Sequence, residues 1–201
     1  MTALQNMEDP AILRKVAAEL QALRSHDSVA SSKSTNQHSD GLPFPPTCFQ
    51  LLRSIHGNCK CVDCGRKNPE WASVTYGVLL CTQCAGKHRS YGVNISRVRS
   101  ITMDCWSHSQ VLAMLEGGNT QLQTFFSRHD MGNEKSRIFD KRYQTKAARF
   151  YRNNMERHIA NIEQVGEWQG RAASRKCATT TQTQQTQKPI PDRQQVAVTA
   201  Q

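Results

Sequence analysis

The sequence lacks any apolar run of the length that a helix needs to cross a bilayer, and it is poor in aromatic residues. Of its 201 residues 6% are aromatic and 37% are hydrophobic, and the mean hydropathy is -0.63. These values are lean for a chain that packs throughout its length. We therefore expect a compact middle with loose ends, in a protein that is soluble or lies on a membrane surface.

The start of the chain lacks an apolar signal segment, because polar residues such as Gln5, Asn6 and Glu8 interrupt it. Position 2 is Thr2 rather than the glycine that myristoylation requires, and no prenylation box ends the chain. These absences predict a reducing, cytoplasmic compartment. In that setting the eight cysteines are better suited to metal binding than to disulfides.

Acidic residues are scarce relative to basic ones. The chain has 26 Lys and Arg against 16 Asp and Glu, a net charge of +10, and a pI near 9.4. Such a balance favours an acidic partner, which is a nucleic acid, an anionic leaflet or an acidic protein. Charge alone does not choose among the three.

Residues 1–46 are predicted to form an N-terminal helix and a disordered linker. The helix spans residues 9–24, where Asp9 and Pro10 suit a helix start, and it is amphipathic. It either packs on the core, forms transiently, or binds a membrane surface or partner. Residues 25–46 turn to Ser, Asn, His, Asp and Gly and end in a Pro-rich run, which is typical of a linker. The apolar positions of the helix are Ile12, Val16, Leu20 and Leu23.

Residues 47–162 are predicted to form the folded domain, of the α+β class. A hairpin within residues 71–80 bends at Tyr76-Gly77, and a third strand spans residues 98–103. Four helices are expected around this sheet. They span residues 47–56 (capped by Thr47), 108–116 (capped by Ser107), 120–128 (capped by Asn119) and 134–162.

The last of these helices is strongly basic. From Lys135 to Arg157 it carries eight basic residues against Asp140 and Glu156. Its outer face is therefore either solvated or turned towards anionic lipid or an acidic partner. Residues 163–201 are predicted to be a disordered Gln/Thr-rich tail. The apolar stripe of the helix is expected to comprise Phe139, Tyr143, Ala147, Phe150 and Met155.

Two Cys-x-x-Cys pairs, Cys61/Cys64 and Cys81/Cys84, are separated by sixteen residues. This spacing is typical of a closed tetrahedral zinc site, and four thiolates leave no position for a catalytic water. We therefore expect one structural zinc ion per chain. The competing interpretations are a redox dithiol or accidental clustering, and Cys59 or His88 are alternative ligands.

The four-cysteine finger alone does not define a function, since nucleic-acid-binding fingers of the GATA type have a loop of nearly the same length. The residues after Cys84 separate the possibilities. The motifs there are Lys87-His88-Arg89-Ser90, Gly92-Val93-Asn94-Ile95-Ser96-Arg97-Val98-Arg99-Ser100, Asp104-Cys105-Trp106 and Gly118-Asn119. Two motifs before Cys84 accompany them, Pro69-Glu70-Trp71-Ala72-Ser73 and Gly77-Val78-Leu79-Leu80-Cys81.

Together these motifs resemble the Arf GTPase-activating protein (ArfGAP) family over roughly residues 47–160, including its pattern Cys-x2-Cys-x16-Cys-x2-Cys-x4-Arg. Residues 143–148 are most similar to the Golgi-type branch. The resemblance implies a small four-cysteine zinc finger with a short antiparallel sheet, surrounded by α-helices. It implies a GTPase activator for GTP-bound Arf-family GTPases in vesicle traffic, with Arg89 as an arginine finger supplied in trans.

The protein would thus be a regulator that lends a catalytic arginine to its partner, rather than a stand-alone enzyme. Trp71, Arg97 and Arg99 are the candidate partner contacts. The expected location is the cytoplasmic face of Golgi or endosomal membranes, with anionic lipid or coat proteins as further partners and no nucleic acid. The alternative is a binding module without activation, either an Arf-binding adaptor or a GATA-like finger.

Overall fold

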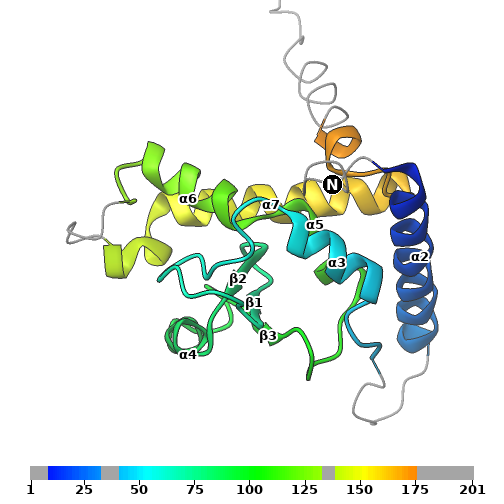
Figure 1. The fold of residues 1–201 in the computed structure, drawn as a ribbon, viewed down its shortest axis with the longest axis horizontal. Coiled ribbons are helices and arrows are strands. Elements are labelled where there is room, and N and C mark those ends of the chain that lie inside the picture. Colours follow the sequence, from blue (N-terminus) through cyan, green and yellow to red (C-terminus); the bar gives the residue numbers. More distant parts are fainter. Residues whose placement is uncertain (1–8, 33–40, 133–138, 176–201) are drawn as a thin grey trace, which may run out of the picture.

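The structure, a computed structural model, describes residues 9–32, 41–132 and 139–175 (Figure 1). It confirms the α+β class, because a small antiparallel sheet lies among packed helices. The strands are β1 (Trp71–Ser73), β2 (Val78–Leu80) and β3 (Val98–Ser100). The helices are α2 (Pro10–Ser32), α3 (Pro46–Ser54), α4 (Thr82–Ser90), α5 (His108–Glu116), α6 (Asn119–Arg128), the 3-10 helix η1 (Phe139–Gln144) and α7 (Lys146–Val165).

The sheet has the order β2-β1-β3, so the first strand lies in the middle. Ala72 pairs antiparallel with Leu79 on one side and with Arg99 on the other. The turn after β1 packs directly on α5. Gly77 there has a φ of 63°, and a Cβ atom on it would lie 2.4 Å from the carbonyl oxygen of Ala113. The predicted hairpin, with its bend at this glycine, is confirmed.

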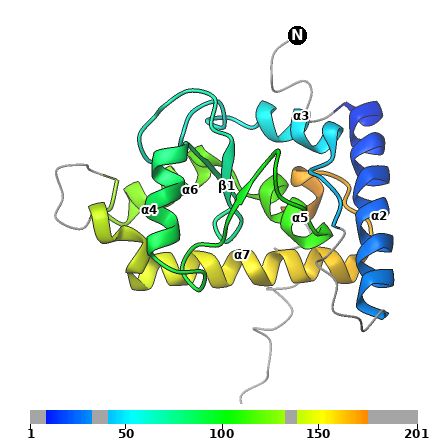
Figure 2. The same cartoon turned by 90° about the horizontal axis from the view of Figure 1, so that it is seen from below.

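Helix α5 lies at the centre of the helical part, and most of its side chains are fully buried. Helix α7 runs alongside it, and α2 and α3 pack on it at the same end of the molecule (Figure 2). The predicted start at Ser107 is confirmed, because the Gln110 side chain accepts a hydrogen bond from the Ser107 backbone N–H, at 3.3 Å. The buried apolar residues of α5 are Val111, Leu112, Ala113, Met114 and Leu115.

Helix α2 packs on the core, which was one of the three interpretations of the N-terminal helix. Val16, Leu20 and Leu23 are at most 2% exposed. The helix continues to Ser32, so the prediction that a linker begins at residue 25 is wrong. Burial of one face explains the difference, since packing stabilises turns that local sequence does not favour.

The last part of the predicted linker also packs. Phe44 is buried with its ring edge-on to the Trp106 ring, at a centroid distance of 4.8 Å. Helix α3 then begins at Pro46, and Thr47 is not its cap. The Glu19 carboxylate of α2 takes that role, because it accepts hydrogen bonds from the backbone N–H groups of Thr47 (3.0 Å) and Cys48 (2.9 Å).

The predicted helix over residues 134–162 is divided. Residues 133–138 lie outside the described part, η1 follows, and Thr145 then caps α7 by accepting a hydrogen bond from the Ala148 N–H at 3.1 Å. The break shifts the buried stripe of α7. Tyr143 and Met155 are buried as predicted, but Phe150 is 58% exposed. The stripe in the structure is Ala148, Tyr151, Met155, Ile159 and Ile162.

The chain remains packed beyond residue 162, in a stretch that the sequence assigns to the tail. Helix α7 runs to Val165, and Trp168 is buried. The Trp168 Nε1–H donates to the Glu116 carboxylate at 2.6 Å, and the Ser174 hydroxyl donates to the same oxygen at 2.8 Å. Residues 176–201 lie outside the described part. Among the helices that are described, none has the length and apolarity to cross a membrane.

Candidate functional site: a four-cysteine centre and an exposed arginine

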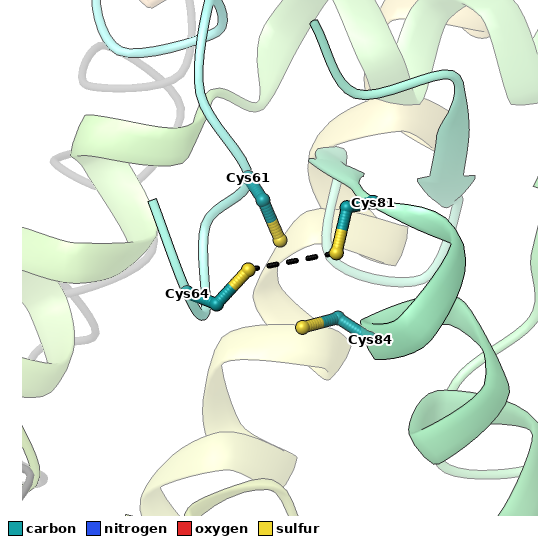
Figure 3. A group of neighbouring side chains, drawn as sticks. All are labelled: Cys61, Cys64, Cys81 and Cys84. Carbon is teal, nitrogen blue, oxygen red and sulfur yellow. Dashed lines mark hydrogen bonds between the residues drawn. The ribbon is translucent and has the colours of Figure 1, made fainter. Parts of the chain in front are cut away.

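The structure brings the four predicted ligands together (Figure 3). The first pair lies on a turn in which the Gly65 N–H donates to the Cys61 carbonyl oxygen at 3.0 Å. The second pair begins directly after β2, where Cys81 is the N-cap of α4. All four sulfur atoms lie within 4.8 Å of one another, and those of Cys64 and Cys81 are 3.5 Å apart.

This geometry fits a tetrahedral metal ion. Zinc–sulfur bonds of about 2.3 Å place the sulfurs of a tetrahedral site about 3.8 Å apart, which lies within the separations found here. Four protein ligands fill such a site, so the metal would be structural. Cys59 is exposed and is not part of the cluster, and neither is His88.

The thiols of the cluster differ in pKa. Burial raises the pKa of Cys61 to about 11, and burial also raises the pKa of Cys84. Burial opposes the shift at Cys81, but hydrogen bonds from the Cys84 backbone and the neighbouring thiols lower its pKa to about 7. A metal ion therefore has to displace protons from at least two of its ligands.

His88 has a structural role. It is fully buried on α4, with Nδ1 2.7 Å from the Ser96 hydroxyl and Nε2 3.0 Å from Asp63 Oδ2. Asp63 lies between the first two cysteines in sequence, so the imidazole ties α4 to the first cysteine pair. Both ring nitrogens therefore have partners within the protein.

Asp63 also binds η1. Its Oδ1 accepts hydrogen bonds from the Arg142 guanidinium and, at 2.6 Å, from the Tyr143 hydroxyl. Burial alone would raise the pKa of this carboxyl, but the hydrogen bond and charge of His88, with Arg142 and Tyr143, outweigh it and lower the pKa to about 2. The carboxylate therefore joins the cysteine centre to an element about eighty residues away. No sequence pattern indicated Arg142 or Tyr143 for this role.

Asn119 holds the other side of the centre. It was predicted as a helix cap, but α6 follows Gly118 as its N-cap, and the Asn119 side chain binds elsewhere. Its Oδ1 accepts a hydrogen bond from the Leu79 N–H at 2.7 Å, and its Nδ2 donates to the carbonyl oxygen of Lys60. One side chain thus links β2 to the residue before Cys61.

Arg89 lies on the last turn of α4, five residues after Cys84. The inward face of this helix consists of Cys84, Ala85 and His88, and Arg89 is exposed at its edge. Its guanidinium carbon lies 4.4 Å from the centroid of the Trp71 ring. Within the described ranges, no carboxylate pairs with this guanidinium.

The two other predicted contact arginines differ from each other. Arg97 precedes β3, is exposed, and lines a hollow of about 590 Å³ against α5 and α7. Arg99 lies within the strand, is half-buried, and donates to the Cys105 carbonyl oxygen at 2.8 Å. Arg97 is available to a partner, whereas Arg99 is engaged in the fold.

Asp104 and Trp106 have structural roles. The Asp104 carboxylate accepts a hydrogen bond from the Ser100 N–H at 2.6 Å. The buried Trp106 donates its indole N–H to the Ser100 carbonyl oxygen at 3.1 Å. Both therefore fix the end of β3.

The site as a whole presents an exposed cation, the Arg89 guanidinium beside the Trp71 ring, which can donate hydrogen bonds to anionic oxygens.

Known proteins resemble this chain in sequence and in fold. The family model ArfGap, described as "Putative GTPase activating protein for Arf", matches residues 47–164. ADP-ribosylation factor GTPase-activating protein 3 of Macaca fascicularis is 43% identical over 111 residues, which cover 55% of this chain and 21% of that protein. ADP-ribosylation factor GTPase-activating protein GCS1 of Saccharomyces cerevisiae is 48% identical over 95 residues, covering 46% of this chain and 27% of that protein.

The chain thus spans about a quarter or less of the length of these relatives. A solved structure of the same kind matches more completely. It is a crystal structure of a "putative GTPase activating protein for ADP ribosylation factor" from Cryptosporidium parvum. It is 31% identical with a TM-score of 0.51, and the match covers 56% of this chain and 88% of that one.

Proposed function

Because the chain belongs to the ArfGap family, we propose that it stimulates GTP hydrolysis by GTP-bound Arf-family GTPases, with Arg89 as an arginine finger. The observation that carries the proposal is the position of Arg89. It is exposed, it lies on the helix that the second cysteine pair begins, and the Trp71 ring supports its guanidinium. A side chain mounted in this way can enter another protein's nucleotide site without disturbing its own fold.

The chemistry required of the activator is small. In phosphoryl transfer, charge develops on the oxygens of the transferred group, and the GTPase itself supplies the phosphate-binding loop, the magnesium ion and the residue that orients water. The planar Arg89 guanidinium donates two parallel hydrogen bonds to such oxygens. It thereby stabilises the transition state more than the ground state, which is the requirement for a faster chemical step.

Two features pre-organise this arginine. Cys61, Cys64, Cys81 and Cys84 hold one structural zinc ion, which when bound clamps the start of α4 to the turn before it. The face of Trp71 attracts the cation and restricts its rotamers, and such contacts contribute about 0.5–1 kcal/mol at exposed sites. Less conformational entropy is then lost when the guanidinium enters the nucleotide site.

Arg97 is the best further contact with the GTPase. It is exposed eight residues after Arg89, and its backbone is held by the Thr75 hydroxyl, which accepts from the Arg97 N–H at 2.9 Å. Arg99 is a weaker candidate because its guanidinium already binds a backbone carbonyl. From the resemblance of residues 143–148 to the Golgi-type branch, we propose that the activity serves vesicle traffic at Golgi membranes.

The test is single-turnover GTP hydrolysis by GTP-loaded Arf with wild-type protein, Arg89→Ala and the control Lys87→Ala. Lys87 is an exposed cation on the same helix. We expect Arg89→Ala to lower the stimulated rate by about 10³–10⁵-fold and the control to remain near wild type. Equal rates for all three proteins would refute the arginine finger. Arf binding without any stimulation by the wild-type protein would identify an adaptor instead.

A further inference from the structure

The outward face of α7 carries a row of exposed cations. Lys146, Arg149 and Arg157 are exposed, and Phe150 lies among them with 58% of its surface accessible. Arg149 and Phe150 follow Lys146 by three and four residues, and Arg157 follows Arg149 by eight. These spacings place all four residues on one side of the helix. At 1.5 Å per residue the row is about 16 Å long. We call these four residues the α7 face.

Acidic side chains do not neutralise the α7 face. The two acids of α7, Glu156 and Glu163, line the hollow that the helix forms with α5, and of the α7 face only Arg149 borders the same hollow. Within residues 9–32, 41–132 and 139–175, no carboxylate pairs with the three cations. Arg152 is different, because it points inward and donates to the Tyr76 hydroxyl at 2.7 Å. The cations of the α7 face are therefore available to an external anion.

The exposed Phe150 adds an apolar group at the centre of the row. Capping at Thr145 sets the phase of α7 so that Tyr151 is buried and Phe150 faces solvent. The free energy falls when a solvent-exposed aromatic ring is covered by an apolar surrounding. Flanked by Lys and Arg, it has the composition of helices that lie in the interface of a bilayer.

We propose that the α7 face docks on the surface of an anionic lipid bilayer. The shape of the surface favours a membrane over an acidic protein. Helix α7 runs along one edge of the molecule (Figure 2), and its exposed cations form a row about three turns long, of which only Arg149 also borders the hollow against α5. Such a row matches the diffuse negative charge of a leaflet. Each Lys or Arg close to such a leaflet raises the binding affinity about fivefold. Phe150 inserts among the head groups.

Vesicle sedimentation tests the proposal, using phosphatidylcholine vesicles with and without phosphatidylserine at low and high salt. The full chain should bind the phosphatidylserine vesicles, and less so at high salt. Lys146→Glu/Arg149→Glu/Arg157→Glu should lower this affinity by about 100-fold or more, because three favourable charges are lost. The matched control is Arg14→Glu/Lys15→Glu/Arg128→Glu, which reverses three exposed cations on α2 and α6.

The control variant should bind the vesicles far more tightly than the α7 variant. Equal binding by the two variants would show that only net charge matters, and it would overturn the proposal. All six side chains are exposed, so both variants should fold, and circular dichroism checks this. Arg89→Ala should bind vesicles as the wild type does, so failure here and failure of the arginine finger are separate results.

Phe150→Ser tests the inserted ring. It should weaken vesicle binding at both salt concentrations while leaving the salt dependence unchanged, since no charge is altered. Met103→Ser is its control, because Met103 is 72% exposed and lies outside the α7 face. If wild-type protein ignored the vesicles and the α7 face were instead required for binding the GTPase, the face would be a protein contact and the membrane proposal would be wrong.

Discussion

The cysteine centre and the helical part of the molecule each contain a buried carboxylate, and the two are stabilised differently. Asp63 faces the Arg142 guanidinium, a buried and permanently charged group, together with His88 and Tyr143. The Glu116 carboxylate faces His158 at 2.9 Å and the neutral donors of Trp168 and Ser174, while the Arg171 and Arg175 guanidiniums bind the Glu116 backbone carbonyl instead. In both regions one carboxylate holds a segment that is distant in the sequence.

The difference follows from how much apolar core each region has. The cysteine region has three strands of three residues each, too short to bury a large surface. We propose that it depends on a bound metal ion as well as on charged hydrogen bonds. The helical region buries most of α5 against α7 and α2, so its carboxylate closes a structure that apolar packing already supports. Arg89 belongs to the region that depends on the metal.

Removal of the metal should have the largest effect, and it should separate the cysteine region from the helical region. Structural zinc contributes about 10–16 kcal/mol of apparent binding free energy in zinc-finger peptides, which exceeds the stability of most domains. We expect a chelator to abolish amide-exchange protection in residues 58–100, while α5 and α7 lose less. Elemental analysis before treatment should find about one zinc ion per chain. Equal loss of protection in the two regions would contradict the division.

Neutralising the two carboxylates should have unequal effects. Asp63→Asn removes the carboxylate that pairs with the buried Arg142 guanidinium and binds His88 and Tyr143, and it should cost about 3–5 kcal/mol. Glu116→Gln leaves Trp168 and Ser174 with a weaker acceptor and keeps the backbone carbonyl that Arg171 and Arg175 bind, so it should cost about 1–3 kcal/mol. Denaturant unfolding of the zinc-loaded proteins measures both free energies. A larger loss of stability in Glu116→Gln than in Asp63→Asn would contradict this prediction.

The stability that Glu116 provides should depend on pH in a defined direction. Burial would raise the pKa of Glu116, but the hydrogen bonds from His158, Trp168 and Ser174 outweigh burial and lower the pKa. Its contribution is therefore fully present above the usual value of 4.5 and is lost as the pH falls through the lowered pKa. The stability gap between wild type and Glu116→Gln should hold from about pH 8 to 5.5. A gap that closed within that range would contradict the assignment.

The smallest effect should come from Cys59→Ser. The thiol is exposed and lies outside the cluster, so the change should alter stability by less than about 0.5 kcal/mol. Zinc content should also remain unchanged. A loss of zinc in this variant would mean that Cys59 takes part in the centre.

Local features of the fold were predictable from the sequence, whereas long-range contacts were not. The cysteine pairs, the hairpin at Gly77 and the helix start at Ser107 depend on a few neighbouring residues. The cap of α3 comes from Glu19, which lies 28 and 29 residues before the N–H groups that it binds. No short-range pattern contains that information.

The same reason explains the site residues that were missed. Asp63 and Arg142 are 79 residues apart, and Trp168 lies 52 residues from Glu116. The polar sequence around Trp168 predicted a tail, but one buried indole and its hydrogen bond hold that stretch on α5. The exposure of Phe150 depended on the single break at Thr145.

The central claim is that a guanidinium fixed by the cysteine centre acts in another protein's nucleotide site. The most direct measurement is single-turnover GTP hydrolysis by Arf with Arg89→Lys, beside a binding measurement on the same protein. A lysine keeps the charge but lacks the planar fork that donates two parallel hydrogen bonds. We expect Arg89→Lys to bind Arf as the wild type does and to stimulate GTP hydrolysis hardly more than Arg89→Ala. Stimulation by Arg89→Lys equal to that of the wild type would contradict it.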